Sequence, residues 1–243
     1  MKHLYIAYLT TLIALICSAP LSAKDGPEMS RNGGLLANDP DQIIAKYIDA
    51  MGGSEKTRKI KNSIVVMKAD FQGTPIVIKS IADAENGRMM QETTVMGNVA
   101  TKTIYKDGKA IMLMMGQQQE LPEDVSEALR AQTYVFPESR YREFGYTLKW
   151  EGVEEVRGEE AHKILIVTKS GTQTFEYYSV ATGLKLLTKS DAAGEIFYSE
   201  YKEFKGIKFP TSIAIKNPML PVELVANLVS VELDTTLSDS DFQ

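Results

Sequence analysis

Short apolar runs with a period of two, divided by glycine-containing turns, make up most of the chain from Ser63 onward. Residues 198–216, YSEYKEFKGIKFPTSIAIK, show this pattern most clearly. Every second side chain of a strand points to the same face, and the glycine of Lys205-Gly206 can adopt the positive φ that a tight turn requires. The stretch therefore predicts a β-hairpin with one apolar face, formed by Ile207, Phe209, Ile213 and Ile215.

Similar runs recur along the chain, and Asp107-Gly108 marks another two-residue hairpin turn. About a dozen strands at hairpin spacing indicate one large antiparallel sheet in one domain, rather than a parallel α/β fold. The turns do not recur with a fixed period, which excludes a propeller or a solenoid. The predicted strands are Ser63–Gln72, Pro75–Asp83, Arg88–Met96, Asn98–Lys106, Lys109–Met115, Tyr146–Trp150, His162–Lys169, Thr172–Val180, Leu184–Ser190, Glu195–Phe204, Ile207–Ile215 and Leu224–Leu233.

Helical spacing is confined to two or three segments outside the strands. Asn38 or Asp39 can cap a first helix, and Gly52-Gly53 can end it. An apolar stripe runs along this helix at Ile43, Ile44, Tyr47, Ile48 and Met51. Further helices are expected from Ser54 to near Ile60 and over Leu121–Ala131. The predicted fold class is therefore α+β, mainly antiparallel β.

The first residues have the pattern of a secretory signal peptide. Lys2 supplies positive charge, Ile6–Ile16 is largely apolar, and Ala23 is a small residue at a cleavage point. We expect residues 1–23 to be removed, residues 24–38 to form a flexible leader, and residues 39–243 to form the folded domain of a periplasmic protein. An anchor helix is less favoured because the apolar run is short. A lipid anchor at Cys17 is less favoured because Ile16 is large for a lipoprotein cleavage site.

Without residues 1–23 the chain would keep 26 Lys and Arg residues against 32 Asp and Glu residues, a net charge of −6, and no cysteine. An acidic chain argues against general binding of nucleic acid. Since no disulfide can form, stability must come from a core, which a domain of this size can bury.

Patterns typical of catalysis or metal binding are missing from the sequence. His162 is the only histidine beyond the predicted signal peptide, and no G-x-S-x-G motif occurs. The pairs Glu154-Glu155 and Glu159-Glu160 are interpreted as solvated faces rather than as glycosidase acids. The segment Asp234–Asp241 lacks the spacing of a calcium loop and is interpreted as a solvated tail. We therefore expect no enzyme, no cofactor and no metal.

Two prolines, Pro75 and Pro210, lie inside strand patterns. Proline cannot donate a hydrogen bond to a sheet, so it belongs on edge strands or at strand ends. The first alternative favours a sheet that curls without closing, since a closed barrel has no edges. The sequence does not decide between the two.

Methionine is unusually frequent in the first half of the predicted sheet, at Met89, Met90, Met96, Met112, Met114 and Met115. Methionine suits surfaces that accept ligands of variable shape, although simple core filling is the alternative. The run 110–115 is apolar on both faces, as expected for a strand that is covered by helices on one side and faces a cavity on the other.

Short motifs distributed over residues 39–243 resemble those of one family in order and spacing. They are Asp41–Gly53 with Glu55-Lys56 and Lys59–Lys61, Ile104–Gly108, Gly145–Lys149 with Gly152 and Arg157–Ile164, Glu200–Pro210, and Leu237–Phe242. Together they resemble the outer-membrane lipoprotein-sorting proteins of the LolA/LolB-like superfamily, in the form common in Bacteroidetes-type bacteria. In that family the hairpin turn is usually followed by Trp, whereas Lys109 follows Gly108 here, so part of the groove is expected to differ.

The resemblance implies a single curved, unclosed half-barrel sheet whose helices act as a lid over a hydrophobic groove. It also implies a carrier of acylated lipoproteins or lipid, with an outer-membrane acceptor as a further partner and no catalytic residues. We expect a monomer. The competing functions are an envelope interaction module without a ligand cavity and, less favoured, an enzyme acting on an envelope substrate. The predicted groove residues are Met89, Tyr105, Met112, Met114, Trp150, Ile207, Phe209 and Ile213.

Overall fold

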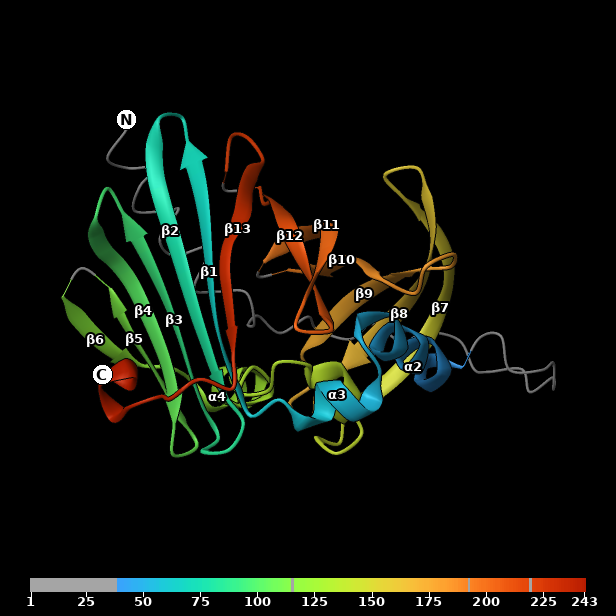
Figure 1. The fold of residues 1–243 in the computed structure, drawn as a ribbon, viewed down its shortest axis with the longest axis horizontal. Helices are drawn as coiled ribbons and strands as arrows, with labels where there is room; N and C mark the ends of the chain where they lie inside the picture. Colours follow the sequence, from blue (N-terminus) through green and yellow to red (C-terminus); the bar gives the residue numbers. More distant parts are fainter. Residues whose placement is uncertain (1–38, 115, 192, 219) are drawn as a thin grey trace.

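The computed structural model describes residues 39–243 except 115, 192 and 219. These residues form one sheet of 13 antiparallel strands in the order β6-β5-β4-β3-β2-β1-β13-β12-β11-β10-β9-β8-β7. The sheet is not closed, because β6 and β7 lie at its two ends. Figure 1 shows the sheet bent into an open trough, with α2, α3 and α4 gathered toward its lower rim in this view. The predicted signal peptide and leader lie outside the described residues.

The elements follow one another as two antiparallel meanders separated by a helical connection. The first meander contains β1 to β6 and the second contains β7 to β13, and the pairing of β1 with β13 joins them. The bounds are α2 Pro40–Met51, α3 Ser54–Lys59, β1 Asn62–Phe71, β2 Thr74–Asp83, β3 Arg88–Val95, β4 Asn98–Lys106, β5 Lys109–Met114, β6 Gln117–Glu120, α4 Glu123–Ala131, η1 Pro137–Arg140, β7 Thr147–Val156, β8 Glu159–Val167, β9 Gln173–Ser179, β10 Lys185–Ser190, β11 Gly194–Phe204, β12 Ile207–Lys216, β13 Leu224–Leu233 and η2 Asp239–Phe242.

The predicted fold class is confirmed, and each predicted strand is present. Both predicted two-residue turns form, with positive φ at Asp107 (54°), Gly108 (78°), Lys205 (51°) and Gly206 (80°). The predicted strand Tyr146–Trp150 is too short and the next predicted strand starts too late, at His162, because β7 runs on to Val156 and β8 begins at Glu159. Strand β6 was not predicted, because its sequence QQQE carries no apolar residue. An edge strand can pair through its backbone alone, so it needs no apolar face.

The hypothesis that the prolines lie on edge strands is wrong, because β2 and β12 are both interior strands. Pro75 is the second residue of β2, as the strand-end alternative predicted. Pro210 lies in the middle of β12, opposite Tyr201 and beside an irregularity of β11 at Glu200, whose φ is 55°. The pairing of β12 with β13 runs from Ser212 to Ile215, so Pro210 lies beyond that ladder.

The first helix forms as predicted. The Asp39 carboxylate accepts a hydrogen bond of 3.0 Å from the Asp41 backbone N–H, and Pro40 occupies the first turn. Gly52, with φ 142°, ends the helix. A Cβ atom on Gly52 would lie 2.5 Å from the Gly206 carbonyl oxygen, so glycine also permits the close approach of the β11–β12 turn. The α2 stripe of Ile43, Ile44, Tyr47, Ile48 and Met51 is buried against the sheet.

Asp234 and Asp239 are exposed, as expected for a solvated tail, but the C-terminal segment is not free, because its apolar residues pack against the sheet. Phe242 is buried, and the Arg88 guanidinium lies 4.1 Å from its ring centre. Arg88 also donates to Asp239 at 2.6 Å and to Asp83 at 2.7 Å. A buried aromatic residue and a buried arginine thus fix η2 against β3, although the intervening residues are acidic.

This tail also corrects the interpretation of β5. Ile111 and Leu113 pack with Leu237 and Phe242, on the sheet face opposite the one that carries α4. The strand is apolar on both faces because the C-terminal segment covers the outer face, and not because that side lines a cavity.

Candidate functional site

The candidate site is the sheet face on which α2 and α4 lie, called the inner face below. Directly opposed residues of antiparallel strands share a face, so the registers trace continuous rows across the sheet. One row runs Met114, Thr101, Thr93, Ile78, Met67, Leu228, and another runs Ile76, Ala69, Ala226, Ile213, Tyr198. The rows join the two meanders into a single surface.

Three apolar clusters divide the inner face. At one end, α4 covers Met89, Tyr105 and Ala110. At the other end, α2 and the segment 132–146, which links α4 to β7 through η1 and is called the connector below, cover residues of β7, β8, β9 and β12. The central cluster lies between them, and its members among the described residues come from strands and two loop positions rather than from a helix. Several apolar side chains there remain partly accessible, namely Val65, Ala100, Tyr198, Ile213 and Leu228.

All eight predicted groove residues lie on the inner face, but they fall into different clusters. Met89 and Tyr105 are buried beneath α4, whereas Ile207 and Phe209 are buried beneath α2 and the connector, with Trp150 half-buried beside them. Ile213 borders the central cluster, and Met112 and Met114 lie on β5 toward the sheet edge. Only Met112, Met114, Trp150 and Ile213 keep appreciable accessible surface.

A band of polar side chains interrupts the inner face between the β5 methionines and the central cluster. Thr93, Thr101 and Thr103 are each at most 2 % exposed, and Gln91 stands opposite Thr103. The Thr103 hydroxyl oxygen is buried and has no hydrogen-bond partner among the described residues. The inner face is therefore not the uniform apolar wall that the sequence suggested.

A buried charged network lies within the α2-covered end. The Lys185 Nζ donates to Glu138 Oε1 of η1 and to Glu176 Oε1 of β9, both at 2.6 Å. The Tyr141 hydroxyl donates to Glu176 at 3.0 Å, and the Tyr178 hydroxyl donates to the same carboxylate. Neither the lysine nor either carboxylate side chain is more than 8 % exposed, so the network ties η1 to the sheet inside an apolar core.

The electrostatics of this network follow from burial and mutual contact. Burial alone would lower the pKa of Lys185, but contact with Glu138 and Glu176 raises it, so the ammonium stays charged. Burial raises the pKa of Glu138, and Glu176 adds to that rise. Burial also raises the pKa of Tyr141 and Tyr178, which therefore remain hydrogen-bond donors.

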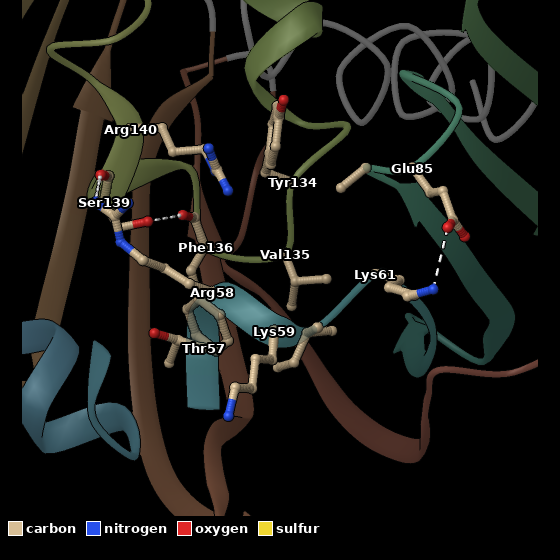
Figure 2. Close-up of a pocket in the computed structure, with 12 residues that line it drawn as sticks. Thr57, Arg58, Lys59, Lys61, Glu85, Tyr134, Val135, Phe136, Ser139 and Arg140 are labelled. Atoms are coloured by element: carbon tan, nitrogen blue, oxygen red, sulfur yellow. Dashed lines mark hydrogen bonds and ion pairs between the residues drawn. The ribbon is translucent and has the colours of Figure 1, made fainter. Parts of the chain in front are cut away.

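A separate pocket of about 290 Å³ opens at the rim, between α3 and the connector. It is lined by residues 57–61, 84–85, 134–136 and 139–140. Figure 2 shows Arg58 and Arg140 approaching it from α3 and η1, with Val135 between them and the Lys61–Glu85 ion pair. The pocket is mixed in character, because its lining combines cationic side chains with the apolar residues Ile60, Val135 and Phe136.

The structure contains no arrangement typical of a metal site in its described part. Among these residues, no group of three or more His, Cys, Asp or Glu side chains could hold a metal ion. Burial lowers the pKa of His162, and Lys46 adds to the effect, so this histidine is neutral near pH 7. None of the described helices is long and apolar enough to cross a membrane.

Sequence reasoning missed the charged network and the rim pocket. Glu176 lies between Phe175 and Tyr177, an alternation that predicts a solvent-exposed position, whereas the structure places Glu176 on the buried inner face. Lys185 reaches that face because the β9–β10 register shifts between Lys185 and Leu187, and no sequence pattern announces this irregularity. The rim pocket combines three distant segments, so no local motif could reveal it.

No family model and no curated protein matches the sequence. Solved structures do match it. A putative outer membrane lipoprotein-sorting protein domain from Vibrio parahaemolyticus superposes with a TM-score of 0.56 at 11% identity, covering 84% of this chain and 97% of that one. A LolA superfamily protein from Nitrosomonas europaea gives a TM-score of 0.54 at 12% identity, with coverage of 84% and 97%.

A third neighbour is a DUF1329 family protein from Desulfovibrio piger ATCC 29098, with a TM-score of 0.54 at 14% identity, covering 84% of this chain and 98% of that one. This chain thus aligns with nearly the full length of each neighbour, although the sequence identity is low. The comparison concerns the arrangement of the sheet and helices rather than individual residues. The chain therefore has the LolA-like fold, an unclosed antiparallel half-barrel with helices as its lid.

Proposed function

We propose that the protein is a periplasmic carrier that binds acyl chains of lipoproteins or lipids on the inner face, and that it serves outer-membrane lipoprotein sorting. The observation that carries the proposal is the set of partly accessible apolar side chains shared by both meanders, including Val65, Ile213 and Leu228. A soluble protein gains nothing by leaving such surface without an occupant. The proteins that share this fold include one described as a putative lipoprotein-sorting domain, which supports the proposal.

The site of the acyl chain is narrower than the whole inner face. The regions beneath α2 and α4 are filled by the protein's own side chains, such as Ile48 and Leu129. We therefore propose that hydrocarbon lies between these two ends, extending from Ile213 and Leu228 across the polar band of Thr93 and Thr101 to Met114. Ile207, Phe209, Met89 and Tyr105 then hold the lid helices rather than the ligand.

The energetics favour this arrangement. Each buried CH₂ group contributes about 0.8 kcal/mol, so a chain of about sixteen carbons could gain on the order of 10 kcal/mol before ordering costs. No catalytic role and no cofactor is part of the proposal. An outer-membrane acceptor is the expected partner, and the carrier is expected to act as a monomer.

Acyl binding can be tested with a fluorescent fatty-acyl probe. Ile213→Asp and Met114→Asp each place a charge on the inner face, so we expect them to weaken probe binding at least tenfold. Val225→Asp is the matched control, because Val225 lies beside Ala226 on β13, is 42% exposed and points to the opposite face. Equal binding by all three variants would contradict the groove.

An interaction module without a ligand cavity remains the second candidate function. The near-complete burial of Ile76, Ile215 and Ala226 in the central cluster favours it, because these side chains resemble a filled core. Under this alternative the probe would not bind the unmodified protein at all.

A further inference from the structure

The rim pocket adjoins the apolar core of the inner face. Phe136 is a buried member of the cluster beneath α2, and Ile60, Tyr134 and Val135 pack against that cluster while lining the pocket. A ligand group held here would therefore lie at the border between the inner face and solvent. This position suits the polar end of an amphiphile whose tail enters the apolar face.

The charge of the pocket is opposite to that of the protein. The chain carries a formal net charge of −5, yet the pocket is lined by the cations Arg58, Lys59, Lys61 and Arg140 and by one carboxylate, Glu85. Such a local excess of positive charge attracts anions.

Both arginines are positioned by the surrounding structure. Arg58 Nη2 donates to the Ser139 carbonyl oxygen at 3.1 Å, and the Arg140 guanidinium lies 4.5 Å from the centre of the Tyr134 ring. A single carboxylate, that of Glu143, forms ion pairs with both of them, at 3.6 Å from Arg58 Nη1 and 2.8 Å from Arg140 Nη1. Since Glu143 is half-exposed, it can yield this place to another anion without leaving a buried charge unpaired.

We infer that the rim pocket binds the phosphate headgroup of an anionic lipid, with Arg58 and Arg140 as its ligands. This inference rests on the proposed function. The pocket borders the cluster beneath α2, and Leu228 packs against both that cluster and the central cluster, over which the acyl chain is proposed to lie. Guanidinium groups bind phosphate through paired, charge-assisted hydrogen bonds, and two fixed guanidinium groups would accept one tetrahedral anion in place of Glu143.

The test uses dodecyl phosphate, dodecyl maltoside and inorganic phosphate, with titration calorimetry on the purified protein below the micelle concentrations. The two amphiphiles share a tail and differ in the headgroup. For Arg58→Gln/Arg140→Gln we expect dodecyl phosphate to bind at least tenfold more weakly, as the loss of charge-assisted hydrogen bonds requires, while dodecyl maltoside changes less than twofold. Lys109→Gln/Lys149→Gln removes the same charge from exposed lysines elsewhere and should leave both affinities unchanged.

Glu143→Gln provides a test with the opposite sign. Because it removes the competing carboxylate, we expect it to tighten dodecyl phosphate binding severalfold, a gain that structural damage cannot produce. The inference would be overturned if the double arginine variant lost affinity equally for both amphiphiles, or if it lost no affinity for dodecyl phosphate. Inorganic phosphate that binds as tightly as dodecyl phosphate would also overturn the inference.

The two proposals fail in different ways. If the unmodified protein binds neither amphiphile, the proposed function fails and this inference fails with it. If dodecyl maltoside binds and the arginine variants leave dodecyl phosphate unaffected, only the headgroup assignment fails.

Discussion

His162 stands opposite Tyr178 on the inner face, and its surroundings favour the neutral imidazole. Burial lowers its pKa below the ordinary value of about 6.5, and the nearby Lys46 lowers it further. The unfolded chain therefore binds more protons between the two pKa values. The corresponding stabilisation is complete above about pH 6.5 and is lost as the pH falls through the folded-state value.

Replacing this histidine isolates its contribution. We expect the unfolding free energy of the unmodified protein to fall relative to that of His162→Gln as the pH is lowered from 7.5 to 5. In the unmodified protein the unfolded state takes up a proton at His162, which favours unfolding, and the variant lacks this group. Denaturant titrations at several pH values measure the difference. If the two stability curves run parallel with pH, His162 is solvated in the folded protein and its pKa is not lowered.

At this scale the sequence predicted which side chains share a face but not how deeply they are buried. The alternation in β12 placed Ile207, Phe209 and Ile213 together correctly. Their different surroundings depend on where α2 and the connector lie, which is a property of distant segments. The unpartnered Thr103 hydroxyl likewise depends on neighbours in three strands.

Among the elements, η1 is tied to the sheet by the ion pair of its Glu138 with the buried Lys185. Lys185→Met would leave Glu138 and Glu176 buried together without their cation, so we expect a loss of about 3–5 kcal/mol in unfolding free energy. Lys189→Met on the same strand is the matched control. Its ion pair with Glu195 is half-exposed on the lysine side, so a loss of at most about 1 kcal/mol is expected.

Chemical denaturation at pH 7 measures both variants. Losses of similar size would mean that the network contributes no more than a surface ion pair. A smaller deficit for Lys185→Met at acidic pH is also expected, because burial already raises the pKa of Glu138 and a protonated carboxyl needs no cation.

Elements whose own sequence carries a strong pattern could be predicted, whereas elements that form through contacts with distant segments could not. Helix α2 has a cap, a stripe and a glycine end within fifteen residues, so its bounds follow from the sequence. Strand β6 has no such pattern, and η2 has only a capping box between Ser238 and Asp241. One forms because β5 offers an unpaired edge, and the other because Phe242 and Arg88 meet on the outer face.

Across the whole molecule, the pairing of β1 with β13 turns two meanders into one bent sheet with a shared inner face. Hairpin spacing predicted the sheet but could not predict the pairing of β1 with β13, because this pairing joins residues about 170 positions apart, as the hydrogen bonds between Asn62 and Thr235 illustrate. The rows of apolar residues across that junction are the basis of the proposed carrier function.

Organic extraction and mass spectrometry of the natively purified protein test this function most directly. If the inner face holds hydrocarbon, an acyl lipid should copurify in near-stoichiometric amount with the unmodified protein and with Val225→Asp, and should be depleted from Ile213→Asp. The absence of lipid from the unmodified protein, together with no saturable uptake of added acyl chains, would contradict the account.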